Sequence, residues 1–486
     1  FLAEGEAPLQ WVARHVELPW TEADWRGRAD QAEALERLAE TQQRPFALAE
    51  PPLMRFALIR TGERCHHFIW SLHHLLLDGW STSQLMGEVL RYYAGEALAA
   101  PAGGYRDYIA WLQGRDSGEA FWREQLARLA APTRLADALP VPREPAPGHG
   151  EVAVTLDEAS VERLTAFAQR TRVTVNTLVQ GAWALVLSRY TGERTVSFGA
   201  TVAGRPGELP GAERMLGLFI NTLPVIVTVD PAATPAALLT GVQATNLALR
   251  EYEHTPLYEI QRWAGYGGQG LFDSLLVFEN YPVDEALGDA SPGGVSFSDV
   301  RHQEATNYPL ALGVQSGETI KLSIGYLRAH LDEPTANSVA QRLMHVLQQL
   351  ADPQMRSFAE VESLDATERR QLDCWGVNPR RYPNPEPVPR LIERQAAATP
   401  QAPAVVFGAQ VLTYAELNAR ANRLAHALIA RGVGPETRVG VAMERSPELV
   451  VGLLAVLKAG GAYVPLDPEH PRERLAYLIE DSGIAL

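Results

Sequence analysis

The sequence predicts an α/β fold, and two observations support this prediction. Short apolar runs typical of strands occur at 196–202 and 221–229. Apolar residues repeat at helical spacing at 160–170 and 176–190. Strands that alternate with helices along a chain are typical of α/β architectures.

Two proline-dense stretches, 131–150 and 379–389, divide the chain, because proline disfavours helix and favours extended links. The chain has 486 residues, which suggests about two to four folding units. The predicted parts are a first lobe at 1–130, a linker and second lobe at 131–370, an interdomain linker at 371–389 and the start of another domain at 390–486.

Composition excludes several classes of protein. The formal net charge is −15, and nucleic-acid binding needs clustered Lys and Arg, so no nucleic-acid partner is expected. No run of about 18 apolar residues suggests a membrane span, and the start of the chain lacks a signal-peptide pattern. Cys65 and Cys374 are too few and too far apart for a metal or disulfide framework. We expect buried or half-buried thiols in a cytoplasmic protein.

The ends of the sequence suggest a piece of a longer protein. The chain starts without Met, and it stops within an apolar phrase at 483–486. We therefore interpret it as an excised part of a larger polypeptide.

The narrowest local pattern is HHLLLDGWS at 73–81. It follows an apolar run at 67–73, which is expected to be a buried strand. A helix is expected to start after the Asp-Gly pair, with Ser81 or Thr82 as its cap. Its apolar face is expected to consist of Leu85, Met86, Val89, Leu90 and Tyr93.

Residue types in this phrase suit proton handling. An imidazole titrates near pH 6.5 and can take or share a proton near neutrality. Asp78 can fix the tautomer of a nearby histidine or pair with an arginine, and the N–H of Gly79 can face a reacting oxygen. A lone histidine at a strand end is usually structural, but the paired histidines followed by Asp-Gly-Trp-Ser favour acyl transfer.

The phrase resembles the HHxxxDG signature of the condensation domains of nonribosomal peptide synthetases. Further stretches resemble later segments of that family, in the family's order, at 105–111, 198–206, 216–224, 254–260 and 272–282. The resemblance covers about residues 1–370. The family's earlier R-H-x-x-L-R-T phrase, which carries a buried arginine in some members, does not occur here.

The last hundred residues resemble a second family. LTYAEL at 412–417 and LKAGGAYVPLDP at 457–468 are similar to the first two signatures of amino-acid adenylation domains. Gly460 and Gly461 lack the G-x-x-x-x-G-K-[ST] frame of a phosphate loop. The resemblance implies the N-terminal part of an adenylation domain, too short to be active. Helices are expected at 414–431 and 447–459, with a strand at 439–443.

The condensation resemblance implies two chloramphenicol-acetyltransferase-like lobes in a V around a tunnel, followed by the start of an adenylate-forming α/β domain. It implies amide-bond formation between a carrier-bound thioester donor and the α-amine of a carrier-bound acceptor. His74 would meet the amine, either as general base or as a positioning group. His73, Asp78 and Gly79 complete the implied catalytic set, and Arg205 is the candidate ion-pair partner of Asp78.

The same resemblance implies partners and leaves rivals open. The partners are upstream and downstream peptidyl carrier domains, which supply phosphopantetheine arms, and the remainder of the adenylation domain. This part of the protein is expected to bind no cofactor or metal itself. The phrase Trp80-Ser81 resembles domains that take an L-configured donor. The rivals are a free-standing acyltransferase of the same fold, an epimerisation domain and an inactive platform that only docks carriers.

Overall fold

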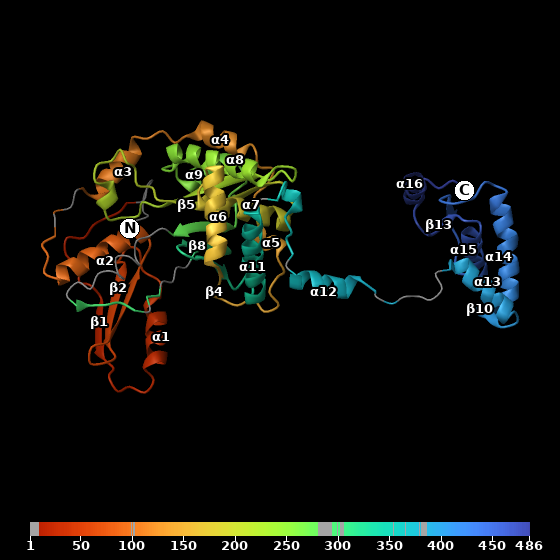
Figure 1. The fold of residues 1–486 in the computed structure, drawn as a ribbon, viewed down its shortest axis with the longest axis horizontal. Coiled ribbons are helices and arrows are strands. Elements are labelled where there is room, and N and C mark those ends of the chain that lie inside the picture. Colours follow the sequence, from red (N-terminus) through yellow and green to blue (C-terminus); the bar gives the residue numbers. More distant parts are fainter. Residues whose placement is uncertain are drawn as a thin grey trace. The chain divides into compact units, whose positions relative to one another are not determined.

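The computed structural model describes residues 9–98, 100, 103–279, 294–298, 300, 301, 306–352, 354–364, 366–378, 380 and 386–486. The chain forms two compact units, Phe1–Leu372 and Asp373–Leu486 (Figure 1). Each unit combines helices with β-sheet, which confirms the predicted α/β class. Among the described residues, no helix is both long and apolar enough to cross a bilayer.

A six-stranded sheet organises most of the first unit, in the order β4-β9-β8-β7-β5-β6. Its strands are β4 His149–Leu156, β5 Thr195–Val202, β6 Asn221–Thr228, β7 Ser274–Glu279, β8 Leu310–Ser316 and β9 Ile320–Leu327. β7 pairs in parallel with β5 and β8, and the other pairs are antiparallel. The strands predicted at 196–202 and 221–229 are confirmed as β5 and β6. Of the resemblance at 272–282, residues 280–282 lie outside the described residues.

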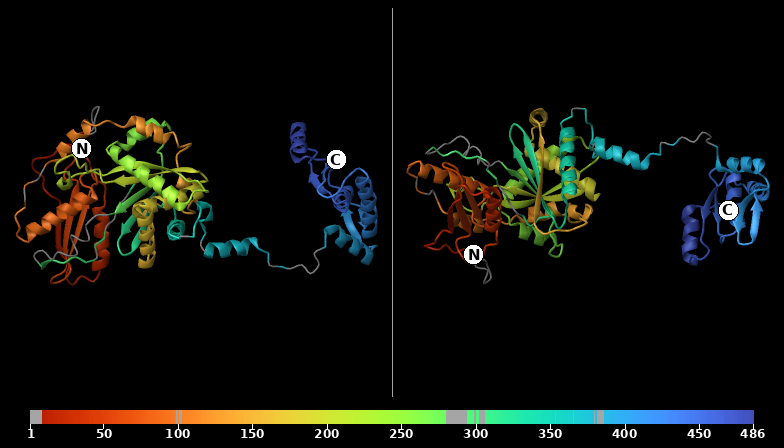
Figure 2. Two further views of the ribbon diagram at one scale, coloured as in Figure 1. Left: turned by 45° about the horizontal axis from the view of Figure 1, so that its top comes forward. Right: turned by 90° about the horizontal axis from the view of Figure 1, so that it is seen from below.

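Helices cover this sheet, as the further views in Figure 2 also show. They include α6 Glu158–Thr171, α7 Val175–Thr191, α8 Pro235–Leu249 and α11 Glu333–Leu350. The central helix is α7, in which residues 177–187 are all buried. A helix that is apolar on all sides is expected to lie inside a core. The helices predicted at 160–170 and 176–190 are thus confirmed as α6 and α7.

A smaller sheet precedes the histidine motif in the chain, in the order β1-β2-β3. Its elements are β1 Trp20–Asp24, α1 Gln31–Gln42, β2 Met54–Arg60 and β3 His66–Leu72. β3 confirms the strand predicted at 67–73, but its residues are exposed or half-buried, so the expected burial is wrong. The reason is that β3 is an edge strand of a three-stranded sheet, where Phe68 and Trp70 stack on Phe56 of β2.

The helix after the motif is α2, Gly79–Tyr93. Its cap is Asp78, whose carboxylate accepts a hydrogen bond from the backbone N–H of Ser81, so the expected cap at Ser81 or Thr82 is wrong. The expected apolar face is also wrong in part, because Val89 and Tyr93 are exposed. The buried face includes Ser81, Ser83 and Leu90. The first turn is covered because Ser81 forms hydrogen bonds with the backbone of Gly217.

The proline-dense stretch at 131–150 is not simply an extended link. Thr133 forms an isolated parallel bridge with Phe272, and Leu135–Ala138 form the short helix α5. The buried carboxylate of Asp273 accepts hydrogen bonds from the backbone N–H groups of Leu135, at 2.9 Å, and Ala136, at 2.8 Å. These contacts pack the start of the stretch against the six-stranded sheet.

The remaining elements of the first unit are mostly short helices. They are α3 Tyr105–Gln113, α4 Glu119–Leu126, η1 Ala212–Arg214, η2 Arg250–Tyr252, α9 Leu257–Ala264 and η4 Phe358–Glu360. The helix α12, Ala366–Gly376, extends into the predicted linker at 371–389, of which residues 379 and 381–385 lie outside the described residues. Cys65 and Cys374 are both exposed, so their predicted burial is wrong.

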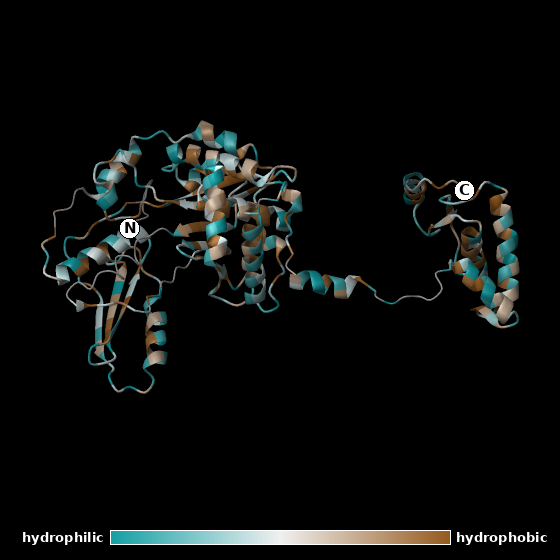
Figure 3. Ribbon diagram, viewed as in Figure 1, coloured by the Kyte–Doolittle hydropathy of each residue, from teal (hydrophilic) through white to brown (hydrophobic). Residues whose placement is uncertain are grey.

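The described part of the second unit contains four helices and two small two-stranded sheets. Its elements are α13 Val388–Ala398, β10 Pro403–Phe407, β11 Gln410–Thr413, α14 Tyr414–Ile429, β12 Arg438–Val441, α15 Pro447–Lys458, β13 Ala462–Pro465 and α16 Arg472–Ser482. The three predicted elements are confirmed as α14, β12 and α15. Thr413 and Glu416 form a capping box at the start of α14, which carries both hydrophilic and hydrophobic residues (Figure 3).

Candidate active site

The four motif residues predicted to act lie together between the end of β3 and the first turn of α2. His73 is half-buried, His74 is exposed and Asp78 is completely buried. Gly79 is the first residue of α2, where a backbone N–H has no acceptor within the helix. The turn from strand to helix therefore leaves His74 open to solvent while it encloses Asp78.

The hydrogen bonds of the two histidines fix opposite tautomers. His74 Nδ1 lies 2.9 Å from the carbonyl oxygen of Leu77. A carbonyl only accepts, so Nδ1 carries the proton and Nε2 of the neutral ring keeps its lone pair. His73 Nδ1 instead accepts from the backbone N–H of Leu75 at 3.1 Å, so its proton resides on Nε2. His74 thus presents a free acceptor nitrogen, and His73 holds the turn.

The surroundings of His73 keep its ring neutral. Burial lowers its pKa below the ordinary value, and a positive charge on the neighbouring His74, when that ring is protonated, lowers it further. Protonation of Nδ1 would also replace the hydrogen bond from Leu75 with two opposed N–H groups. The turn that carries His74 therefore depends on a neutral His73.

Asp78 is held by three donors from two parts of the chain. Its Oδ1 accepts from the backbone N–H of Ser81 at 2.7 Å, and its Oδ2 accepts from the backbone N–H of Phe219 at 2.9 Å. Arg205 Nη2 lies 3.3 Å from Oδ1, with both side chains almost fully enclosed. Asp78 is therefore surrounded by donors from the protein.

Arg205 also binds the segment between β5 and β6. Its Nη1 donates to the carbonyl oxygens of Ala212, at 2.5 Å, and Met215, at 2.9 Å. Its guanidinium carbon lies 4.1 Å from the ring centre of Phe219. Burial lowers the pKa of Arg205, and the charge of Asp78 opposes that change. The arginine remains charged, because a guanidinium is not deprotonated in proteins.

We term residues 212–219 the crossing segment. Its backbone carbonyl groups accept hydrogen bonds from the start of α2, between Asp78 and Gln84. Trp80 Nε1 donates to the carbonyl oxygen of Glu213 at 3.2 Å. Gln84 Nε2 donates to the same oxygen. The backbone N–H of Asp78 donates to the carbonyl oxygen of Gly217 at 3.2 Å. The motif is therefore shaped by a segment more than 130 positions away in the sequence.

Two glycines allow this close approach. Gly204 has φ +62°, and a Cβ there would overlap the carbonyl oxygen of Phe219. A Cβ at Gly217 would overlap the ring of Tyr105 in α3. The hydroxyl of Tyr105 donates to the carbonyl oxygen of Leu218 at 2.6 Å, and burial raises its pKa to about 12, so it stays protonated.

Sequence reasoning missed most of these partners. Trp80 was noted only as part of a phrase, Ser81 as part of that phrase and as a candidate helix cap, and Tyr105 and Phe219 only as parts of two family-like stretches. The signal was the occurrence of those stretches together. It indicated that residues 105–111 and 216–224 belong to the same family pattern as the histidine motif, but it could not show that these two stretches are in contact.

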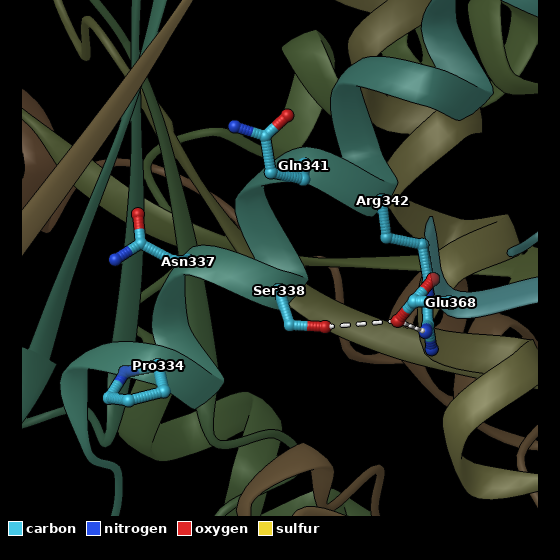
Figure 4. A pocket seen from close by; sticks show the side chains of 6 residues that line it. All are labelled: Pro334, Asn337, Ser338, Gln341, Arg342 and Glu368. Carbon is cyan, nitrogen blue, oxygen red and sulfur yellow. Dashed lines mark hydrogen bonds and ion pairs between the residues drawn. The ribbon is translucent and has the colours of Figure 1, made fainter. Parts of the chain in front are cut away.

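Other parts of the first unit offer weaker sites. In the described residues, no group of three or more His, Cys, Asp or Glu side chains is placed to hold a metal ion. A cleft of about 230 Å³ lies between α11 and α12, and Figure 4 draws the side chains that line it. Its Arg342 already pairs with Glu368 at 2.6 Å, and none of the predicted catalytic residues lines it. The histidine motif is the better candidate.

Comparison with known protein families assigns the first unit to a family. The family model of the condensation domain matches residues 1–373. The chain belongs to the condensation-domain family. Residues 392–486 match the family of AMP-binding enzymes, which confirms the predicted order of a condensation domain followed by adenylation-domain sequence.

Curated relatives support the same order. The chain is 42% identical to a linear gramicidin synthase of Brevibacillus parabrevis over 454 residues, covering 91% of this chain and 9% of that protein. It is 37% identical to surfactin synthase subunit 2 of Bacillus subtilis over 470 residues, which cover 94% of this chain and 13% of that protein. The chain thus spans about a tenth of the length of these relatives.

Solved structures show the fold. A crystal structure of the nonribosomal peptide synthetase FmoA3 in its AMPPNP-bound form has a TM-score of 0.72 at 22% identity, covering 96% of this chain and 50% of that chain. A starter condensation domain of rhizomide synthetase has a TM-score of 0.60 at 21% identity, and the match covers 72% of this chain and 81% of that chain. The condensation domain described here therefore has the fold of synthetase condensation domains.

We predict that Asp78→Ala destabilises the condensation domain by about 3–5 kcal/mol, because it leaves Arg205 buried without its counter-charge. Chemical denaturation measures this change. The matched control is Asp157→Ala, which removes an unburied helix cap and should cost only about 1 kcal/mol. A soluble Asp78→Ala protein with unchanged stability but no activity would place Asp78 in the chemistry itself.

A second prediction concerns acid. The pKa of an unfolded histidine is about 6.5. The pKa of His73 is lower in the folded state, so at pH values between the two pKa values the unfolded state binds more protons than the folded state. Stability should therefore fall as pH decreases below about 6.5. Melting temperatures from about pH 7 to 5 should fall less steeply for His73→Asn, whose side-chain oxygen can still accept from Leu75. Parallel slopes for the two proteins would refute this role of His73.

Proposed function

We propose that the condensation domain catalyses amide-bond formation between a carrier-bound aminoacyl or peptidyl thioester and the α-amine of a carrier-bound aminoacyl acceptor. The observation that supports this most is the contact between His74 Nδ1 and the carbonyl oxygen of Leu77, which leaves Nε2 of this exposed ring free, on a turn held by the buried Asp78. This arrangement can accept a proton or a hydrogen bond from an incoming amine.

The proposed reaction needs little chemical assistance beyond alignment. The amine nitrogen attacks the thioester carbon, the C–N bond forms and the C–S bond breaks. The proton that the nitrogen loses passes, directly or through His74 Nε2, to the leaving sulfur, which becomes the carrier's thiol. An α-ammonium titrates near 8, so His74 Nε2 can take its proton or orient the free amine. Holding the two groups in line supplies several kcal/mol of the barrier reduction. In this proposal His73 and Asp78 position the turn, and the N–H of Gly79 faces the reacting oxygen.

The partners follow from this proposal. Upstream and downstream peptidyl carrier domains would present substrates on phosphopantetheine arms, and the remainder of an adenylation domain would follow. The names of the curated relatives, which are synthases for peptides such as gramicidin and surfactin, support this context. Trp80 and Ser81 support an L-configured donor, by resemblance.

The domain limits proposed are 1–130 for the first lobe, 131–370 for the linker and second lobe, 371–389 for the interdomain linker and 390–486 for adenylation sequence. The family matches at 1–373 and 392–486 support the outer limits of the condensation part and of the adenylation sequence. The match of residues 392–486 to AMP-binding enzymes also favours a condensation domain of a synthetase over a free-standing acyltransferase.

We predict that His74→Ala lowers the rate of dipeptide formation by roughly 100-fold or more, the scale of a general acid–base contribution. The rate is measured in the synthetase module with both carriers loaded. His67→Ala, which removes an exposed histidine from the preceding strand, should leave it unchanged. Turnover of His74→Ala within a few-fold of the natural protein would make His74 a structural residue.

The second unit is predicted not to activate an amino acid by itself. Residues 386–486 contain no Ser/Thr/Gly-rich phosphate loop, and Gly460 and Gly461 follow the end of α15, with Gly460 at φ +85°. We expect the chain to show no amino-acid-dependent pyrophosphate exchange and no ATP-dependent protection from hydrogen exchange after residue 389. Either signal, measured on this chain, would contradict the prediction.

A further inference from the structure

Ser81 occupies a three-way junction that the proposed mechanism does not use. Its side chain is completely buried in the first turn of α2. Its hydroxyl donates to the carbonyl oxygen of Gly217 at 2.8 Å. It accepts from the backbone N–H of Gly217 at 3.1 Å and from Arg205 Nη2 at 2.7 Å. A serine hydroxyl has one donor and two acceptor positions, so its hydrogen-bonding capacity is fully used.

The distances show that this hydroxyl, more than the ion pair, ties Arg205 to α2. Arg205 Nη2 is 2.7 Å from Ser81 Oγ but 3.3 Å from Asp78 Oδ1. The same oxygen of Asp78 is already bound by the backbone N–H of Ser81 at 2.7 Å. Without the Ser81 hydroxyl, the guanidinium would keep only the longer contact with the first turn of α2.

The crossing segment depends on the same hydroxyl. Gly217 is buried, and its N–H and its carbonyl oxygen both bind Ser81. The next residue but one, Phe219, supplies the backbone N–H that binds Asp78 Oδ2. Loss of the hydroxyl would leave a buried N–H without an acceptor, which is costlier than losing an exposed hydrogen bond.

We infer that Ser81 is a positioning residue for the histidine turn. It holds Arg205 beside Asp78 and fastens Gly217 to α2, and it thereby sets the turn on which His74 stands. The effect on turnover rests on the proposed function, whereas the effect on the crossing segment does not. Because Ser81 acts through other residues and not on substrate, its loss should lower kcat and leave KM nearly unchanged.

The test compares Ser81→Ala and Ser81→Cys with a matched control. The cysteine is nearly isosteric, and its thiol is a weak hydrogen-bonding group, so this variant removes the contacts without opening a cavity. The control is Ser197→Ala, because Ser197 is equally buried and its hydroxyl also donates to a distant backbone carbonyl, that of Leu271, at 2.8 Å. The whole chain is used for hydrogen exchange, and the synthetase module with loaded carriers is used for kinetics.

Both Ser81 variants should raise hydrogen exchange at residues 212–219 and lower kcat by roughly tenfold or more, the rate equivalent of a lost buried hydrogen bond. Ser197→Ala should change neither quantity. Unchanged exchange at 212–219 in Ser81→Cys, or raised exchange with natural kcat, would overturn the inference. If the natural protein fails to condense its substrates, the proposed function fails, and the exchange result alone decides whether Ser81 holds the crossing segment.

Discussion

Asp78 carries a negative charge in a site that is completely enclosed, and an ionised carboxylate is stable there only if donors surround it. One donor, the backbone N–H of Ser81, belongs to the helix that Asp78 caps. The other two, Arg205 and the backbone N–H of Phe219, lie at the two ends of the loop that joins β5 to β6. Enclosing this one carboxylate therefore requires the motif and the six-stranded sheet to meet at one place.

This constraint explains why the histidines stand as they do. The turn from β3 to α2 spans only residues 73–78, and its far end is fixed by Asp78. Within so short a turn, Leu75 and Leu77 supply the backbone groups that bind His73 and His74. Opposite tautomers follow, because one group is a donor and the other is an acceptor. A free Nε2 on His74 is thus a consequence of local backbone geometry together with a distant charge pair.

Much of the fold could be predicted from the sequence, because strong local patterns agree with the structure. The buried helix α7 is a long, mostly apolar segment, the strands β5 and β6 are short apolar runs, and each occurs close to its predicted position. Burial was harder to predict. Phe68 and Trp70 form an apolar run, yet they lie on an edge strand, and Val89 and Tyr93 occupy helical spacing but face solvent. Pattern shows which residues share a face, but tertiary contacts decide whether that face is covered.

The candidate site shows the same limit. The motif could be identified from its residues, and the cap at Asp78 is a local contact with Ser81, but the junction at Ser81 depends on a segment more than 130 positions away. No periodicity links Ser81 to Gly217, so only the folded chain reveals that contact. The glycines at 204 and 217 are understandable in retrospect, because each lies where a backbone or ring comes too close for a side chain.

The enclosed Asp78 and its partners leave His74 as the tautomer with a free Nε2. Nitrogen-15 NMR of the imidazole rings in histidine-labelled protein at neutral pH measures this directly, since protonated and unprotonated ring nitrogens differ widely in chemical shift. We predict a protonated Nδ1 and an unprotonated Nε2 for His74, and the opposite pattern for His73. A His74 ring protonated on Nε2, or two rings that share one tautomer, would contradict the account.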